Sequence, residues 1–423
     1  MLSVQYIREN VERVKHDVLL RNTTAPIDRI LELDDARRAL LQQVETLRAK
    51  RNTVSKLIGA SKDAAGREER IKEMRIVGDE IDALDAQLKT VESELHEKLY
   101  EVPNILDPNA PHGPDEESNV VLEMVGEKRS FGFQPRPHWE LGALVDGIDF
   151  ERGVKMSGTR FFVLKGSIAR LHRALIQFFL DEHVAAGFEE CYVPYMLSEA
   201  SLYAAGQLPK FRENLYKDDE QDYFFIPTAE VALVNLHRDE ILPAGSLPQH
   251  LVAHTPCFRR EKMSAGRDVR GIKRVHQFEK VEMFVYCEPE ESEHEFEHLL
   301  MRARSLPEKL GIAYRVVALC SGDIGFNATK TYDIEMWSPG QGEWIEVSSV
   351  SNCLDFQARR ANIRYRPADE GPTRHPHLLN GSGLPPGRTL IALMENYQRE
   401  DGSIEVPEVL RKYMGGMDVI PAI

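Results

Sequence analysis

The chain has 423 residues, of which 42% are hydrophobic and 29% are charged, so it is long enough for two domains and too apolar for a disordered protein. No stretch approaches the roughly 18–20 apolar residues that a membrane helix needs, and the charged N-terminus lacks the pattern of a secretion signal, so we expect a cytoplasmic protein. The net charge of −15 argues against broad affinity for nucleic acid, although it leaves room for a local basic surface.

Residues 27–102 carry two long series of apolar residues at alternating steps of three and four, the first of which is interrupted at Arg37 and Arg51. A period of 3.5 residues sustained over this length is the pattern of a coiled-coil seam. The segment 59–66, GASKDAAG, contains small and turn-forming residues, which predict that the chain reverses there. We therefore expect two helices folded into one antiparallel arm on the order of 45 Å long. The seam positions are Ile30, Leu33, Leu40, Val44, Leu47, Val54 and Ile58, then Met74, Val77, Ile81, Leu84, Leu88, Val91, Leu95 and Val102.

The first helix of this arm is rich in basic side chains. Such a row forms either a solvated helix face or a phosphate-binding surface on an otherwise acidic protein. Composition alone favours the solvated face, and both interpretations stay open. The basic residues are Arg29, Arg37, Arg38, Arg48, Lys50, Arg51, Lys56 and Lys62.

Residues 103–118, PNILDPNAPHGPDEES, are too rich in proline, aspartate and asparagine to continue a helix. We interpret this segment as a linker between an N-terminal domain, 1–110, and a second domain, 111–423. In the second domain short β-like runs alternate with helical ones, without the regular rhythm of a parallel sheet. The segments 250–260 and 272–287 are predicted to be long strands of an antiparallel hairpin. The predicted class is α+β, with an antiparallel coiled-coil arm followed by an antiparallel sheet flanked by helices.

The two predicted long strands carry residues suited to binding a nucleotide and an amino acid. Positions 274, 278 and 282 differ by even numbers, so they share one face of an unbroken strand. An arginine fork binds phosphate oxygens, an aromatic ring stacks on a base, and a carboxylate holds an ammonium group or accepts a hydroxyl hydrogen. Spacing alone also fits a charged strand surface. The set is Arg259, Arg260, Glu261, Arg274, Phe278 and Glu282.

Two further segments offer oxygen ligands and a phosphate contact. Glu346 and Ser349, at the end of a predicted strand, could supply oxygens to Mg²⁺. The glycine-rich segment 380–383 leads to Arg388, at the start of a predicted helix, where its guanidinium could contact a phosphate. The alternative is a tight turn before a buried helix. The sequence has no GxxxxGK[ST] motif, so we do not expect a P-loop nucleotide site.

Histidine and cysteine patterns give little support for a metal site. His294, Glu295 and His298 match the HExxH pattern of zinc proteases. Many acidic neighbours and the lack of a third-ligand motif favour a solvated helix, so we expect no structural zinc. The five cysteines are odd in number and form no CxxC pair, which favours buried thiols. They are Cys191, Cys257, Cys287, Cys320 and Cys353.

A series of short motifs resembles the seryl-tRNA synthetase family of class II. Each motif alone is degenerate, whereas the whole set in this order is specific and covers nearly the whole chain, arm included. One departure is the loop REKMSAG at 260–266, where many members carry SEAGS. The motifs are GQLPKF (206–211), PTAE (227–230), CFRRE (257–261), RDVRG (267–271), HQFEKVE (276–282), SNC (351–353), DFQARR (355–360), LNGSG (379–383) and ENYQ (395–398).

The resemblance implies an enzyme that activates L-serine with ATP and Mg²⁺, then transfers serine to tRNA(Ser), with tRNA(Sec) a further candidate. It implies that the coiled-coil arm grips the tRNA and that a motif around Pro194 forms a homodimer. Serine binding would fall to Thr228, Ala229, Glu230, Glu282, Asn380 and Ser382. ATP binding would fall to Arg259, Arg260, Glu261, Arg274, Val275, Phe278, Glu346, Val347, Ser348, Ser349 and Arg388, with Arg259 and Arg388 catalytic and Glu346 and Ser349 as Mg²⁺ ligands.

Three other classes of protein are alternatives. A paralogue that loads an amino acid onto a carrier protein would lack the arm. A non-catalytic interaction protein would be expected to have lost Arg259, Glu282 or Arg388, which are all present. A zinc protease would bind metal through its HExxH helix.

Overall fold

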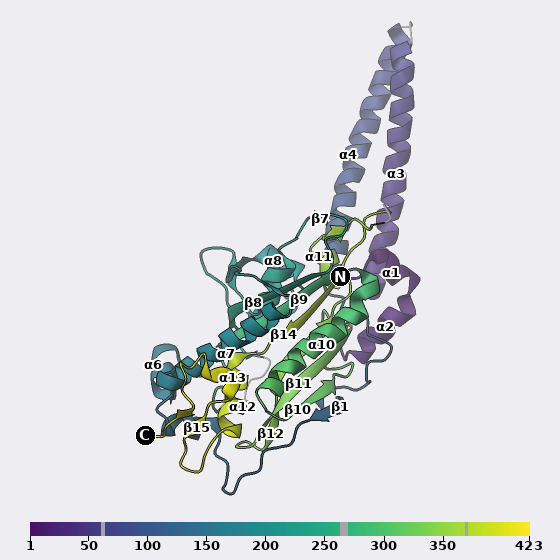
Figure 1. The fold of residues 1–423 in the computed structure, drawn as a ribbon. Helices are drawn as coiled ribbons and strands as arrows, with labels where there is room; N and C mark the ends of the chain where they lie inside the picture. The colour runs from purple at the N-terminus through teal and green to yellow at the C-terminus, as the bar shows by residue number, and fades with distance from the viewer. Residues whose placement is uncertain (61–63, 263–269, 369–370) are drawn as a thin grey trace. The chain divides into compact units, whose positions relative to one another are not determined.

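The computed structural model describes residues 1–60, 64–262, 270–368 and 371–423 (Figure 1). Two compact units are present. The arm unit comprises Leu2–Leu19 and Thr23–Pro103, and the sheet unit comprises Met1, Leu20–Asn22 and Asn104–Ile423. Lys62, the middle of the predicted turn at 59–66, and most of the 260–266 loop and the RDVRG motif lie outside the described residues. The domain division at residue 110 stays a prediction.

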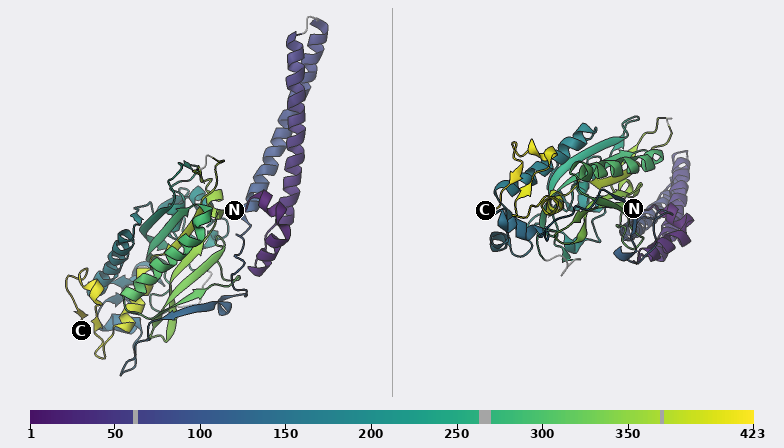
Figure 2. Two further views of the ribbon diagram at one scale, coloured as in Figure 1. Left: turned by 45° about the vertical axis from the view of Figure 1, so that its right-hand side comes forward. Right: turned by 60° about the horizontal axis from the view of Figure 1, so that its bottom comes forward.

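The arm unit consists of two short helices followed by two long antiparallel ones, as the 3.5-residue period predicts. The long helices α3 and α4 run side by side (Figures 1 and 2), and Val44, Met74, Val77 and Ile81 pack between them. The predicted turn was too wide, because α3 continues through Ala60 and α4 begins at Ala64. In α3 the seam packing extends to Val54 and Ile58, which lie just before Gly59, so the helix continues past this helix-weakening residue. The helices are α1 (Val4–Glu9), α2 (Val11–Leu20), α3 (Ile27–Ala60) and α4 (Ala64–Tyr100).

The sheet unit is built on eight strands in the order β1-β10-β11-β12-β14-β9-β8-β4. Every neighbouring pair is antiparallel except β4 and β8, which are parallel. The predicted antiparallel sheet is therefore confirmed, with one parallel strand at its edge. The strands are β1 (Val120–Val125), β4 (Glu189–Glu190), β8 (Gln249–Phe258), β9 (Gln277–Cys287), β10 (Tyr314–Ala318), β11 (Lys330–Ser338), β12 (Glu343–Asn352) and β14 (His377–Ser382).

Helices cover one face of this sheet and part of the other. Because side chains alternate along a strand, β9 sends Val281, Met283 and Val285 into a core with α7 (Gly166–Ala185), α10 (Ser292–Lys309) and α12 (Pro386–Asn396). Figure 1 shows α10 lying along the strands on this face. On the other face Phe284 and Tyr286 pack with α8 (Glu199–Ala204), α9 (Ala229–Val234) and α11 (Phe356–Arg360). The rest of that second face stays open toward the site described below.

Short elements connect these layers. They are α5 (His138–Leu144), β2 (Ile148–Asp149), α6 (Phe150–Ser157), β3 (Val163–Leu164), β5 (Met196–Ser198), β6 (Tyr223–Phe225), β7 (Ile241–Leu242), β13 (Arg364–Tyr365), β15 (Ile404–Glu405), α13 (Glu408–Arg411) and β16 (Val419–Ile420). Single 3₁₀ turns occur at Glu116–Ser118, Arg212–Asn214 and Pro289–Glu291. Among the described residues, none of the helices has the length and apolar character that crossing a bilayer requires.

The predicted linker, 103–118, begins where the two units divide, and from Asn104 onward it belongs to the sheet unit. The Asn104 side-chain amide donates to the carbonyls of Asn327 (2.8 Å) and Cys353 (2.9 Å), and Leu106 and Ala110 are buried. Prolines and turn residues forbid a helix here, but they do not prevent a strap that packs on another surface.

Two strand predictions also need correction. The second long strand begins at Gln277 rather than at residue 272, so Arg274 precedes the strand. The even spacing from Arg274 to Glu282 therefore does not explain how Arg274 is placed. Glu346 and Ser349 lie in the middle of β12 rather than at its end.

Candidate active site and basic arm

A cavity of about 550 Å³ opens on the uncovered part of the sheet. Its lining combines β9, β12 and β14 with the segment before β9 and the start of α12. Thirteen of the predicted site residues line it, and four do not: Thr228, Ala229, Arg260 and Ser348. The thirteen are Glu230, Arg259, Glu261, Arg274, Val275, Phe278, Glu282, Glu346, Val347, Ser349, Asn380, Ser382 and Arg388.

A β-bulge in β12 brings Glu346 and Ser349 to the same face. Ser348 pairs with Ile334 of β11, but the next pair is Glu346 with Glu335, which leaves Val347 as an extra residue. In a regular strand, residues three apart point to opposite faces, and one extra residue restores a common face. Both side chains therefore line the cavity. Ser348 faces the other way, and its hydroxyl donates to the Ser382 carbonyl (2.7 Å).

Three arginines, Arg259, Arg274 and Arg388, line the cavity. The Arg259 Nε donates to the Pro227 carbonyl (3.1 Å), and its guanidinium lies 5.2 Å from the centre of the Phe278 ring. Arg388 donates from Nε to the Lys273 carbonyl (3.2 Å) and from Nη1 to the Glu346 carbonyl (2.9 Å). These backbone contacts fix each fork before any ligand binds, which suits recognition of phosphate oxygens. Arg274, the third arginine, lies 3.8 Å from Glu261.

Two carboxylates of the lining, Glu230 and Glu282, lie close enough to interact electrostatically. Glu282 is 1% exposed, accepts a hydrogen bond from the Thr228 hydroxyl (2.8 Å), and forms an ion pair with Lys280. Glu230 accepts a hydrogen bond from the Gln357 amide (2.5 Å). Thr228 caps the N-terminus of α9 by accepting from the Glu230 backbone N–H (3.4 Å). Thr228 and Ala229 therefore position Glu230 and Glu282 from outside the lining.

The two carboxylates differ in their electrostatic environment. Burial, together with the negative charge of Glu282, raises the pKa of Glu230 to about 7, although Lys280 and Gln357 oppose the shift. The charge of Glu282 is balanced by Lys280. Glu230 forms no ion pair with a described residue, so its carboxylate is available to an incoming ammonium group.

Arg260 points away from the cavity, unlike its neighbour Arg259. Its Nε donates to the Leu215 carbonyl (2.8 Å), and its guanidinium lies 4.8 Å from the centre of the Tyr216 ring. It therefore stabilises the loop after the Arg212–Asn214 turn. The resemblance placed it with the ATP-binding residues, and the structure does not bring it to them.

Several residues that line the cavity were not predicted from the sequence. Lys280 and Ser351 line the cavity, and Lys280 shares the even spacing of Phe278 and Glu282, so the same strand argument would have found it. Asn214 ends a single 3₁₀ turn and Lys273 lies in a loop, and neither segment has a periodic pattern that points to a face. Only the folded chain identifies them.

The basic side chains of the arm fall into two groups. Near its base and middle, Arg29, Arg48 and Lys50 pair with Glu94 (2.7 Å), Asp85 (2.7 Å) and Glu73 (2.8 Å), and Arg37 and Arg38 pair with buried Asp34. Toward the tip Lys72 pairs with Glu68 (3.3 Å), whereas five other basic residues make no ion pair with any described residue, and exposed apolar side chains accompany them. A phosphate-binding surface therefore fits the outer part of the arm. The unpaired residues are Arg51, Lys56, Arg67, Arg70 and Arg75, and the apolar ones are Leu57, Ile71 and Ile76.

Comparison with known proteins assigns both units to one family. Residues 1–106 match the seryl-tRNA synthetase N-terminal domain, and residues 211–397 match the tRNA synthetase class II core domain (G, H, P, S and T). A serine–tRNA ligase from Roseiflexus sp. (strain RS-1) is 56% identical over 421 residues, covering 99% of each chain.

Solved structures agree. The seryl-tRNA synthetase from Pyrococcus horikoshii, complexed with ATP, matches all of both chains with a TM-score of 0.94 and 37% identity. The cytoplasmic serine–tRNA ligase from Naegleria fowleri, in complex with AMP, matches with a TM-score of 0.89 and 29% identity over 100% of this chain and 99% of the other. With this likeness extending over its full length, the chain belongs to the seryl-tRNA synthetase family.

Proposed function

We propose that this chain activates L-serine with ATP to form seryl-adenylate and then transfers serine to the 3′ end of tRNA(Ser), working in the cytoplasm. The observation that carries the proposal is the lining of one cavity. It holds the carboxylates Glu230 and Glu282 together with the arginines Arg259 and Arg388. An amino acid has an ammonium group and a carboxylate at opposite ends, and ATP adds phosphates next to the carboxylate. One cavity therefore suits both substrates.

Glu230 and Glu282 would recognise serine by both of its polar groups. Glu230, which forms no ion pair with any described residue, would bind the ammonium. Glu282, already balanced by Lys280 and held by Thr228, would accept the hydrogen bond of the serine hydroxyl, with Asn380 and Ser382 beside it on β14. A buried group built to bond a hydroxyl rejects an analogue without one by about 10⁴–10⁵. Alanine and glycine would thus be excluded.

The three arginines and the Phe278 ring would hold ATP. Phe278 would stack on the adenine, with Glu261 and Val275 beside it, and Arg274 and Arg388 would contact the outer phosphates. Arg259 would bridge the serine carboxylate and the α-phosphate. These assignments follow the family motifs and the common lining of one cavity.

The residues at the bulge fit a magnesium ion brought by ATP. Glu346 and Ser349 share a face, and the partner of Ser349 on β11 is Asp333, whose buried Oδ1 has no hydrogen-bond partner among the described residues. Carboxylate and hydroxyl oxygens are donors that Mg²⁺ accepts. Glu346 and Ser349 would hold the ion, which when bound neutralises phosphate charge.

The reaction needs no protein nucleophile. A serine carboxylate oxygen attacks the α-phosphorus, and the bond from that phosphorus to the bridging oxygen of pyrophosphate breaks. The fixed guanidiniums of Arg259 and Arg388 stabilise the charge that develops on phosphate oxygens, so the chain's contribution is orientation and electrostatics. The terminal ribose hydroxyl of the tRNA then attacks the seryl carbonyl carbon, and AMP leaves.

The arm would supply the tRNA contact, since the outer basic residues Arg70 and Arg75 are exposed and unpaired with any described residue. tRNA(Sec) is a second candidate, because it would present a similar phosphate backbone to the same surface.

A homodimer forms part of the proposal. In the segment after β4, Tyr192 is 89% exposed, and Pro194 and Met196 are exposed beside it. Such an apolar row is suited to pairing with a second copy. We expect the chain to sediment at twice its 48.2 kDa mass, and Tyr192→Glu to shift the equilibrium toward monomer. Sedimentation equilibrium measures this, and a wild-type monomer at micromolar concentration would contradict it.

The pKa of Glu230 predicts how serine binding depends on pH. Because the deprotonated carboxylate binds the ammonium, the KM for serine should fall about tenfold from pH 6 to pH 8. Glu230→Gln should raise this KM and remove its pH dependence. The stability of the ligand-free protein should change with pH in the opposite sense to serine binding. The folded state holds the proton of the Glu230 carboxyl more tightly than the unfolded chain does. The free energy of unfolding should therefore fall as pH rises from about 4.5 to 7. A wild-type serine KM that is flat over this range would refute the assignment.

Serine-dependent ATP–pyrophosphate exchange, run with threonine, alanine and glycine as competitors and with tRNA charging alongside, tests the proposal. Exchange with serine alone together with charging of serine tRNA would support it. Exchange without charging would indicate a carrier-protein ligase instead, and no exchange from folded protein would indicate a non-catalytic interaction protein.

A further inference from the structure

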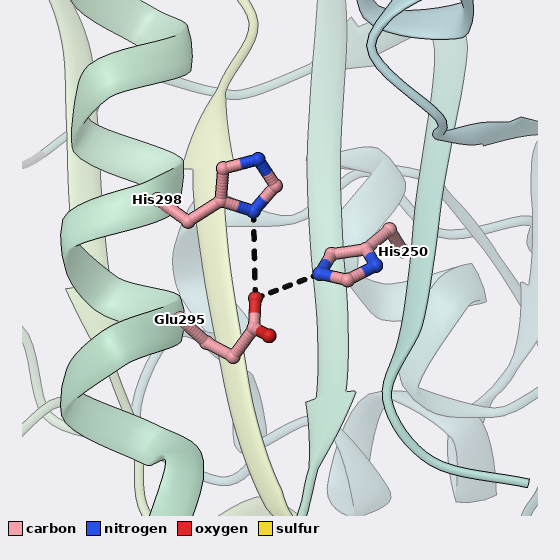
Figure 3. Close-up of side chains that lie close together, drawn as sticks. All are labelled: His250, Glu295 and His298. Carbon is pink, nitrogen blue, oxygen red and sulfur yellow. Dashed lines mark hydrogen bonds and ion pairs between the residues drawn. The ribbon is translucent and has the colours of Figure 1, made fainter.

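Three potential metal ligands converge between α10 and β8 (Figure 3). Nε2 of His250 lies 2.7 Å from a carboxylate oxygen of Glu295, and Nδ1 of His298 lies 3.5 Å from the same oxygen. The three ligating atoms all lie within 4.8 Å of one another. None of the three residues lines the active-site cavity.

The cluster uses only part of the HExxH pattern. Glu295 and His298 are three residues apart, so they share one side of α10. The third member, His250, comes from β8, 45 residues earlier in the chain. His294, the first histidine of the pattern, is 76% exposed at its side chain. The sequence predicts no zinc partly because no third-ligand motif follows HExxH, and the fold supplies a third donor in His250.

The expectation that these residues form a solvated helix face is wrong for the cluster itself. Glu295 is 4% exposed, and His250 and His298 are half-buried. The ring of Phe188 packs against both histidines, with centroids 5.4 and 5.8 Å away. Two imidazoles and a carboxylate in a shielded site are a donor set that Zn²⁺ prefers.

We propose that His250, Glu295 and His298 bind one Zn²⁺, with a fourth position open to solvent. Ligands at about 2.0–2.1 Å from a tetrahedral ion stand about 3.3 Å apart. The separations of 2.7 and 3.5 Å to Glu295 differ from that by less than about 1 Å, and the two histidine nitrogens lie within 4.8 Å of each other, so modest side-chain rotations bring the three donors around one ion. The ion replaces the hydrogen bond that otherwise joins Glu295 to His250.

The role of this ion is to join helix to sheet. His250 and Val252 are two residues apart on β8, so their side chains share one face of the sheet. Val252 packs in the core with α7, α10 and α12. The cluster therefore lies on the face of the sheet opposite the active-site cavity. The ligands fix α10 to β8 through bonds that the unfolded chain cannot form. Binding to the folded state alone raises the melting temperature.

The test uses the full chain, purified without a histidine tag, stripped with EDTA and titrated with Zn²⁺ against a chromophoric chelator. One equivalent should bind per chain and raise the melting temperature, and Co²⁺ in its place should give a visible tetrahedral spectrum. Since even an outer-shell partner changes metal affinity by about 10–100-fold, His250→Gln and His298→Gln should each weaken binding by more than about tenfold. His294→Gln is the matched control and should leave the affinity within twofold.

Serine-dependent exchange serves as the folding control, because none of these residues belongs to the catalytic cavity. No saturable binding to active wild-type protein would overturn the proposal. So would binding that survives in active His250→Gln protein, and so would loss of binding in His294→Gln, which would indicate the sequence-motif ligands instead.

Discussion

Replacing Arg259 with alanine should lower the kcat of serine-dependent ATP–pyrophosphate exchange by about 10²–10³-fold, the loss typical when one fixed donor to a developing anion is removed. The Pro227 carbonyl and the Phe278 ring hold this guanidinium in the cavity, so its orientation costs nothing at the moment of reaction. The lost hydrogen bond to Pro227 would change stability by only about 1 kcal/mol. The measurement is steady-state exchange kinetics together with thermal melting.

Arg260→Ala is the matched control. The two arginines are neighbours with the same charge, but Arg260 binds the Leu215 carbonyl and the Tyr216 ring outside the cavity. Its replacement should reduce kcat by less than about tenfold, through disorder of the loop it holds. Equal losses from the two substitutions would contradict the separation that the structure makes between them.

Shortening the arm should abolish tRNA charging and leave amino-acid activation intact. Deleting residues 42–81 and joining Leu41 to Asp82 with a short Gly-Ser loop removes the outer basic surface. It keeps the base, where Arg8 pairs with Asp34 (2.9 Å) and Arg29 with Glu94 (2.7 Å). Charging should fall at least about a hundredfold, because the phosphate contacts that supply affinity are lost. Exchange should stay within about twofold, because every residue lining the cavity lies in the sheet unit.

A charge-reversal variant separates the arm's charge from its length. Arg70→Glu with Arg75→Glu keeps both helices, since neither residue pairs with a described carboxylate. tRNA charging should weaken. The slope of the logarithm of the tRNA association constant against the logarithm of salt concentration should become shallower by about 1–2. Circular dichroism should show unchanged helicity. Loss of exchange in the folded truncation, or full charging by it, would contradict the proposed division of labour between the units.

The sequence by itself determined the features that depend on local pattern. A 3.5-residue period specified the antiparallel arm, because neighbouring turns of one helix decide which side chains form a seam. The hairpin of β8 and β9 followed from two apolar runs around a polar loop. The ordered motifs indicated the family and most of the cavity lining, including Arg259, Phe278 and Glu282.

Only the tertiary structure decided the features that depend on how separate elements meet. The bulge at Val347 turns the Ser349 side chain to the same face as Glu346. The bulge is visible in the register of β12 against β11, and the sequence of β12 alone does not reveal it. Arg274 reaches the cavity from outside the strand, whereas Arg260 turns away from it. His250 meets Glu295 across 45 residues. Periodicity describes one element at a time, whereas strand register and packing between elements come from hydrogen bonds and contacts that form only when distant segments are brought together.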